Sequence, residues 1–180
     1  MRTVTFLRIR LLLAISLTVS AFPGYSSSVY QRPADFISEV FQGVEVPAAR
    51  LWLNKHLQKE IHRILGHDLG VLRLRYWGHG TRTAWILEEV GKEQPITAGI
   101  VVDAGRIEQL KVLIFRETRG GEIRYPFFTD QFKGAFMEQG ERLSKRIDGI
   151  SGATLSVRAV TKLARLALLL HRHSNFADSS

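Results

Sequence analysis

The chain contains no cysteine among its 180 residues, and this absence removes several ways of holding a fold or a redox group. Disulfide bonds, haem attachment through a C-x-x-C-H motif, cysteine-ligated iron–sulfur clusters and lipoprotein acylation are all excluded. Any cofactor must therefore be held by other chemistry.

Acidic residues are also absent from residues 1–30, a segment that contains three arginines, Arg2, Arg8 and Arg10. An apolar run starts at Leu11 and is shorter than the roughly 20 residues that a membrane span needs. Small residues follow it, and cleavage after Ala21 or within residues 26–28 would suit a signal peptidase. We therefore predict a secretory signal peptide over residues 1–28 and a periplasmic protein, which an uncleaved segment would anchor to the membrane.

The formal net charge is +8, and removal of the three N-terminal arginines leaves 22 basic and 17 acidic residues, a net charge of +5. Basic residues are scattered along the chain, without the aromatic-interleaved basic run that is typical of nucleic-acid binding. The composition indicates a solvated, mildly basic surface, and nucleic acid is not an expected partner.

Residues 31–66 show a helical pattern in which apolar residues recur at spacings of three and four, at Leu53, Leu57, Ile61 and Ile64. Gly66 is a natural C-terminal stop. We therefore expect an N-terminal helical segment over residues 29–66. His56 and His62 do not share a helix face, which argues against a zinc site.

Short runs typical of β-strands follow between residues 71 and 117, and Leu72, Leu74 and Tyr76 alternate with Arg73 and Arg75 in the first of them. Turn residues separate four such runs, which predicts an antiparallel meander. We expect an α+β domain over residues 67–175, an antiparallel sheet covered by helices, and a frayed tail over residues 176–180.

The longest helical pattern starts near Leu155 and carries an apolar face opposite Arg158, Lys162 and Arg165. Residues 166–170 are apolar nearly all round, so they are either deeply buried, which we favour, or covered by a partner. His171 and His173 favour an ordinary basic C-terminal turn over a metal pair.

Residues 148–154, D-G-I-S-G-A-T, form a loop that leads into this helix. N–H groups of a first helical turn lack intrahelical partners and, with the helix dipole, suit a phosphate. Gly152 permits close approach of the backbone, Ala153 keeps the neighbouring side chain small, and Thr154 supplies a hydroxyl. The alternative is a plain helix cap by Ser151 or Thr154, but a cap explains only one hydroxyl.

Written as D-x-x-S-G-A-T, this stretch resembles the flavinylation motif of the FMN-binding domain family, which includes components of the sodium-translocating NADH:quinone reductase and of the related Rnf complex. In that family, a separate magnesium-dependent flavin transferase takes FAD as donor and esterifies the last threonine to the FMN phosphate. The resemblance covers about residues 72–170. It implies FMN bound covalently to Thr154, with a motif loop formed by Asp148, Ser151, Gly152 and Ala153.

A second stretch, Glu117-Thr118-Arg119-Gly120, resembles the E-T-P-G-x-G loop of the same family, with Arg119 in place of proline and Glu122 in place of the last glycine. The resemblance implies that Thr118 contacts the flavin ring system and that Glu117 and Arg119 set the charge around it. A plain glycine-rich turn is the alternative.

An aromatic segment follows that also resembles the family, with Gln131 and Gly134 among Phe127, Phe128, Phe132 and Phe136. Aromatic residues at such spacing are usually core, and we expect most of these in the core. One or two of them are candidates to line the flavin ring.

The resemblance implies an exported electron-transfer flavoprotein that is a redox carrier rather than a stand-alone enzyme. Its partners would be the flavin transferase and redox proteins in or at the membrane. Covalent attachment suits export, because a tethered cofactor is not lost by dilution. Two alternatives stay open: a flavin-dependent reductase of a small substrate, and an unflavinylated module that binds anions or membrane surfaces.

Overall fold

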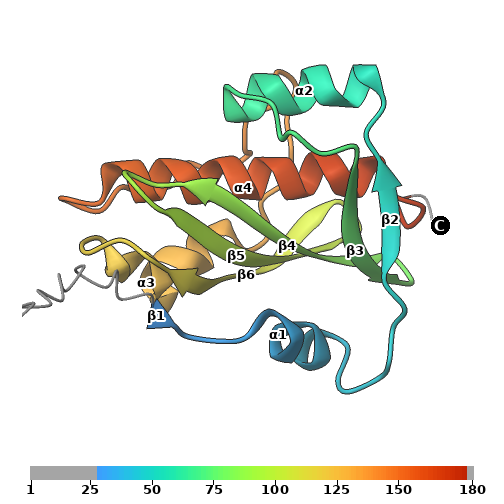
Figure 1. Cartoon of the computed structure of the whole chain (residues 1–180), viewed down its shortest axis with the longest axis horizontal. Helices are drawn as coiled ribbons and strands as arrows, with labels where there is room; N and C mark the ends of the chain where they lie inside the picture. Colours follow the sequence, from blue (N-terminus) through green and yellow to red (C-terminus); the bar gives the residue numbers. More distant parts are fainter. Residues whose placement is uncertain (1–27, 178–180) are drawn as a thin grey trace, which may run out of the picture.

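The computed structural model describes residues 28–177. Within this range, six strands form one antiparallel sheet in the order β1-β6-β5-β4-β3-β2, with helices on both faces (Figure 1). The expected α+β fold is confirmed. The predicted signal peptide lies outside the described residues except for Ser28. No helix within the described range is long and apolar enough to cross a membrane.

The predicted meander forms the middle of the sheet. Its strands are β3 (Arg73–His79), β4 (Arg82–Val90), β5 (Pro95–Asp103) and β6 (Arg106–Phe115), each antiparallel to the next. Residues 96–102 of β5 are buried, because this strand lies between two others and both of its faces are covered.

Residues 31–66 do not form the continuous helical segment that we expected. Helices α1 (Pro33–Val40) and α2 (Lys55–Leu65) are separated by β2 (Ala49–Trp52), which pairs with β3. Strand β1 (Ser28–Val29) pairs with β6. Both outer strands of the sheet thus come from residues that precede position 67. The prediction missed β2 because four residues are too few to show a clear alternation.

Helix α4 (Thr154–Arg172) packs across β4 and β5, with α2 beside it, and the main core lies between these helices and the sheet (Figure 1). Residues 166–170 are all buried, as predicted. Helix α1 covers part of the opposite face, where Phe36 and Phe41 pack against Val101 and Leu113.

His171 lies in the last turn of α4, as predicted, and its side chain is buried. Its Nε2 accepts a hydrogen bond from the Gly105 N–H at 3.3 Å, so Nδ1 carries the proton and donates to the Thr83 hydroxyl at 2.8 Å. The Trp85 indole N–H donates to the same hydroxyl at 2.9 Å. Burial lowers the pKa of His171 below its ordinary value, so the neutral imidazole belongs to the fold.

After α4 the chain turns back onto β3. The ring of Phe176 meets Tyr76 edge-on at 6.1 Å and lies 2.4 Å from where a Cβ on Gly78 would stand. Phe176, in the described part of the predicted frayed tail, therefore packs against the sheet.

Between β6 and α4 lie three short helical segments: η1 (Gly121–Arg124), α3 (Pro126–Thr129) and η2 (Asp130–Phe132). Phe128 and Phe132 are buried and contact each other edge-to-face at 5.5 Å, as expected for core aromatics. Phe127 and Phe136 are exposed instead.

Candidate functional site

The start of α4 has no side-chain cap. Its N-cap residue is Ala153, which has no side-chain acceptor, and neither Ser151 nor Thr154 bonds to a first-turn N–H. Thr154 is the first residue of the helix and its side chain is exposed. The alternative of a plain helix cap is therefore wrong. What remains is an accessible hydroxyl beside N–H groups that no side chain satisfies.

The motif loop reaches α4 through Gly152, whose φ of 80° lies in the left-handed region. A Cβ built there would meet no atom within 4 Å, so the conformation, and not crowding, requires glycine. Asp148 and Ser151 are exposed on the same loop. The left-handed φ is thus a second reason for glycine here, beside the predicted close approach of a phosphate to the backbone.

The two stretches that resemble the FMN-binding domain family lie against each other. Gly120 has a φ of 87° and is buried, and a Cβ on it would stand 3.1 Å from the Ala153 Cβ and 3.2 Å from the Ser156 Oγ. The loop after β6 therefore packs directly on the start of α4.

Gln131 links the aromatic segment to the motif loop. Its side-chain oxygen accepts a hydrogen bond from the Asp148 N–H at 2.7 Å, and its amide nitrogen donates to the Phe127 carbonyl at 3.3 Å. The sequence named Gln131 only as part of a resemblance and gave it no role. In the structure it holds the motif loop at the point where that loop begins.

Glu117 clamps the turn between β4 and β5. One of its carboxylate oxygens accepts the backbone N–H groups of Lys92, Glu93 and Gln94 at 2.5, 2.7 and 3.1 Å. Burial would raise the pKa of Glu117, but these donors outweigh burial and hold the pKa below its ordinary value. The carboxylate is thus ionised and engaged by the turn, while Thr118 and Arg119 beside it are exposed.

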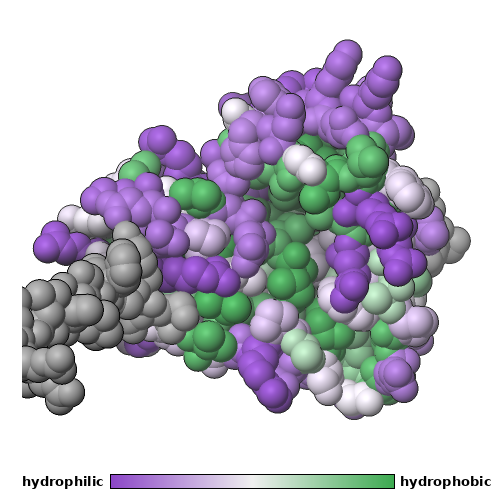
Figure 2. All heavy atoms as spheres, viewed as in Figure 1, coloured by the Kyte–Doolittle hydropathy of each residue, from purple (hydrophilic) through white to green (hydrophobic). Residues whose placement is uncertain are grey.

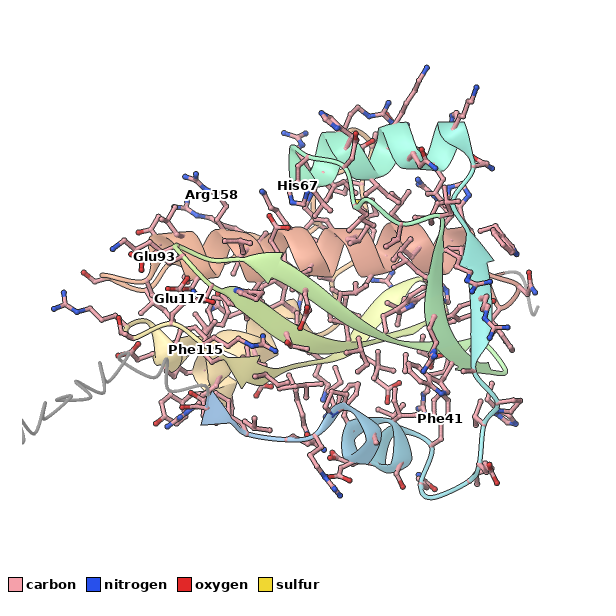
Figure 3. The ribbon with its side chains drawn as sticks, viewed as in Figure 1. Phe41, His67, Glu93, Phe115, Glu117 and Arg158 are labelled. Atoms are coloured by element: carbon pink, nitrogen blue, oxygen red, sulfur yellow. The ribbon has the colours of Figure 1, made fainter. Side chains whose placement is uncertain are left out.

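Arg158 lies one helical turn after Thr154, so the two side chains project from the same side of α4. Figure 3 shows Arg158, Glu93 and Glu117 together at the end of the molecule where α4 begins. The sequence analysis placed Arg158 opposite the apolar face of this helix and gave it no role. Its i, i+4 spacing from Thr154 could have indicated that the two side chains lie on the same side of the helix. An exposed guanidinium here is positioned to neutralise an anion at the helix start.

A cavity of about 610 Å³ lies beside β6 and α3, and its walls include Tyr30, Arg124 and Tyr125. The Arg124 guanidinium lies between these two rings, 4.5 and 4.6 Å from their centroids. The volume falls in the range of small-molecule sites, but no residue of 117–120 or 148–154 lines this cavity. The uncapped helix start, where the exposed Thr154 hydroxyl lies, is the better candidate site.

In a comparison with protein families, residues 91–169 match the model of the FMN-binding domain. The match begins in the turn that Glu117 clamps and ends within α4, so it includes both loops described above. The comparison with curated proteins finds no match.

Proposed function

The chain belongs to the FMN-binding domain family, and on this premise we propose that it is an exported electron-transfer flavoprotein whose FMN is joined through a phosphoester to Thr154. One observation carries the proposal. An exposed threonine hydroxyl occupies the first position of a helix that no side chain caps, directly after the sequence D-G-I-S-G-A.

The residues at the helix start fit a phosphate diester. Free first-turn N–H groups and the helix dipole stabilise an anion by about 0.3–1 kcal/mol, and by about 2 kcal/mol in partly buried geometry. Arg158 adds a cation on the side of the helix that carries Thr154. These contributions would orient a phosphate but are too small to retain free FMN. A covalent link to Thr154 would therefore be what keeps FMN on the protein.

Attachment is a phosphoryl-group transfer at the Thr154 oxygen. The bond from this oxygen to the FMN phosphorus of FAD forms, the bond from that phosphorus to AMP breaks, and the hydroxyl proton leaves. A threonine hydroxyl is a weak nucleophile at neutral pH, so we propose that a separate flavin transferase supplies the base and the metal. Asp148 and Ser151 are exposed and thus accessible to that enzyme.

Bound FMN would supply the electron-transfer chemistry, and the chain would hold it and set its surroundings. Thr118 and Arg119 are exposed on the loop that packs against the helix start, which supports a role near the flavin. A cation near the ring would favour the reduced, anionic form. We propose redox proteins in or at the membrane as partners.

The test is intact mass and peptide mapping after co-expression with a flavin transferase in an exporting host. We expect one FMN less one water per chain, on the peptide that contains Thr154. Thr154→Val keeps the β-branched shape and should give a folded, colourless protein. Thr161→Val on the same helix is the matched control and should stay yellow.

Flavin on another residue, or flavin that survives denaturation in Thr154→Val, would refute the attachment site. A wild type that binds FMN only reversibly under these conditions would refute the covalent link while leaving the family membership intact.

A further inference from the structure

Strands β2 and β3 carry a row of basic side chains on the face that turns away from α2 and α4. Residues directly opposite in an antiparallel pair share a face, and here Arg50 faces Arg75 while Trp52 faces Arg73. All four side chains are exposed, whereas their neighbours Leu51 and Leu74 pack against the main core. Figure 2 shows hydrophilic side chains gathered over these two strands.

The Arg50–Arg75 pairing is unfavourable in the isolated chain, because like charges directly opposite in a sheet repel. Neither residue, nor Arg73, forms an ion pair with any acidic side chain among residues 28–177. Other exposed basic residues do find such partners, for example Arg32 with Asp35 and Arg63 with Glu141. The three arginines therefore leave a cationic surface that an external anion would complement.

Apolar side chains lie at the same edge of the sheet, and Leu72, which alternates with Arg73, is on the side of α2. Trp52 is 63% exposed, with the Arg73 guanidinium 5.6 Å from its ring, and Leu72 and Val71 are 69% and 46% exposed where β3 begins. A cavity of about 210 Å³, lined in part by Leu53, Leu69 and Leu72, opens beside them. We call the exposed residues the edge patch: Arg50, Trp52, Val71, Leu72, Arg73 and Arg75.

We propose that the edge patch docks on a bilayer surface that contains anionic phospholipid. Arginine binds phosphate in a bidentate manner, tryptophan prefers the headgroup region, and exposed aliphatic side chains gain by entering the acyl boundary. The patch combines all three on one edge of the sheet. A single aromatic residue does not make the stacking platform of a single-strand nucleic-acid site.

The proposal also fixes an orientation. The segment after α4 contacts β3 through Tyr76, so the C-terminal end of α4 lies near the edge patch and Thr154 lies at the far end of the helix (Figure 1). With 19 residues, α4 is about 28 Å long. The candidate flavin site would then point away from the lipid surface toward proteins beside it.

The test measures partition of the full chain onto vesicles of equal parts phosphatidylglycerol and phosphatidylcholine, and onto phosphatidylcholine alone, at physiological ionic strength. Each basic residue near an anionic surface contributes about 1 kcal/mol, or about fivefold in partition. The variant Arg50→Gln/Arg73→Gln/Arg75→Gln should thus bind on the order of 100-fold less tightly. Its unfolding midpoint should be unchanged or higher, because the repulsion between opposed arginines is removed.

A matched control is Arg142→Gln/Lys145→Gln/Arg146→Gln, which removes the same charge from positions elsewhere on the surface and should lose only a few-fold in partition. If the N-terminal segment also attaches the chain to the vesicles, the partition of the variants would not report on the edge patch. A second measurement is therefore the quenching of Trp52 fluorescence by brominated lipid, taken as the difference between wild type and Trp52→Phe. We expect quenching on anionic vesicles.

Partition that is equal for wild type and the triple arginine variant, with Trp52 unquenched, overturns the proposal. Capture of an acidic protein through the edge patch without vesicle binding also overturns it, in favour of a protein partner. Neither result bears on the attachment of FMN to Thr154.

Discussion

Replacing Gly120 by alanine tests the contact between the loop after β6 and the start of α4. At a φ of 87° an L-residue costs about 1–2 kcal/mol. The new Cβ would also stand 3.1 Å from the Ala153 Cβ and 3.2 Å from the Ser156 Oγ, and such overpacking costs about 1–3 kcal/mol more. We expect Gly120→Ala to lower the free energy of unfolding by about 2–5 kcal/mol.

Gly152→Ala is a matched control, because its φ is 80° and a Cβ there meets no atom within 4 Å. It should cost only the backbone term of about 1–2 kcal/mol. Urea unfolding of the two unflavinylated variants and the wild type gives the comparison, with equal m-values as the condition for attributing the shift to stability. Ser156→Ala in the Gly120→Ala background should recover part of the loss.

If Gly120→Ala and Gly152→Ala lower the free energy of unfolding equally, within about 0.5 kcal/mol, the packing of the loop after β6 on the start of α4 is refuted. The two positions have similar φ angles and differ only in the crowding around the new Cβ. The same variants report on function. Displacement of Ala153 moves the residue next to Thr154, so Gly120→Ala should also slow flavin attachment by the transferase.

Two further predictions concern ionisable groups. Glu117→Ala should leave the N–H groups of residues 92–94 without their acceptor and should speed their hydrogen exchange. Glu93→Gln, which removes only the exposed ion-pair partner of Lys92, should leave that exchange unchanged. Unchanged exchange in Glu117→Ala would contradict the role of Glu117 in this turn. Because burial lowers the pKa of His171, its contribution to stability is complete above the unfolded pKa of about 6.5 and declines as the pH falls below that value. His171→Gln should therefore reduce the loss of the urea midpoint between pH 7 and pH 5. His67, whose pKa is raised by the Asp68 carbonyl and by Glu89, contributes below about pH 6.5 and loses its contribution as the pH rises, so His67→Gln should have the opposite effect.

The meander and α4 were predictable because their patterns are long and their periods distinct. Strand β2 was not, because its four residues are too few to show a clear alternation and end directly before Leu53, where the helical spacing that continues through α2 begins. Strand β1 has only two residues, and its partner in β6 lies far along the sequence. Pairings of this kind depend on tertiary contacts that local sequence does not contain.

At the candidate site, the position of the motif loop before α4 followed from sequence, and so did the family. The contact of Gly120 with Ala153 did not, since it depends on where β6 ends. Nor did the role of Glu117, because the resemblance placed its charge near a flavin ring while the fold uses the carboxylate in a turn. The attachment of FMN to Thr154 and the roles of Asp148 and Ser151 stay predictions.

The exposure of Thr154 bears on the timing of maturation. The fold completes its core without any contribution from this side chain, and α4 is secured at its far end by buried residues 166–170 and by His171. The proposed transferase would therefore be able to act on a finished domain, without an unfolded or nascent chain. The proposed modification would then be a late step that follows folding, and we expect the unmodified protein to accumulate in a folded form wherever a transferase is absent.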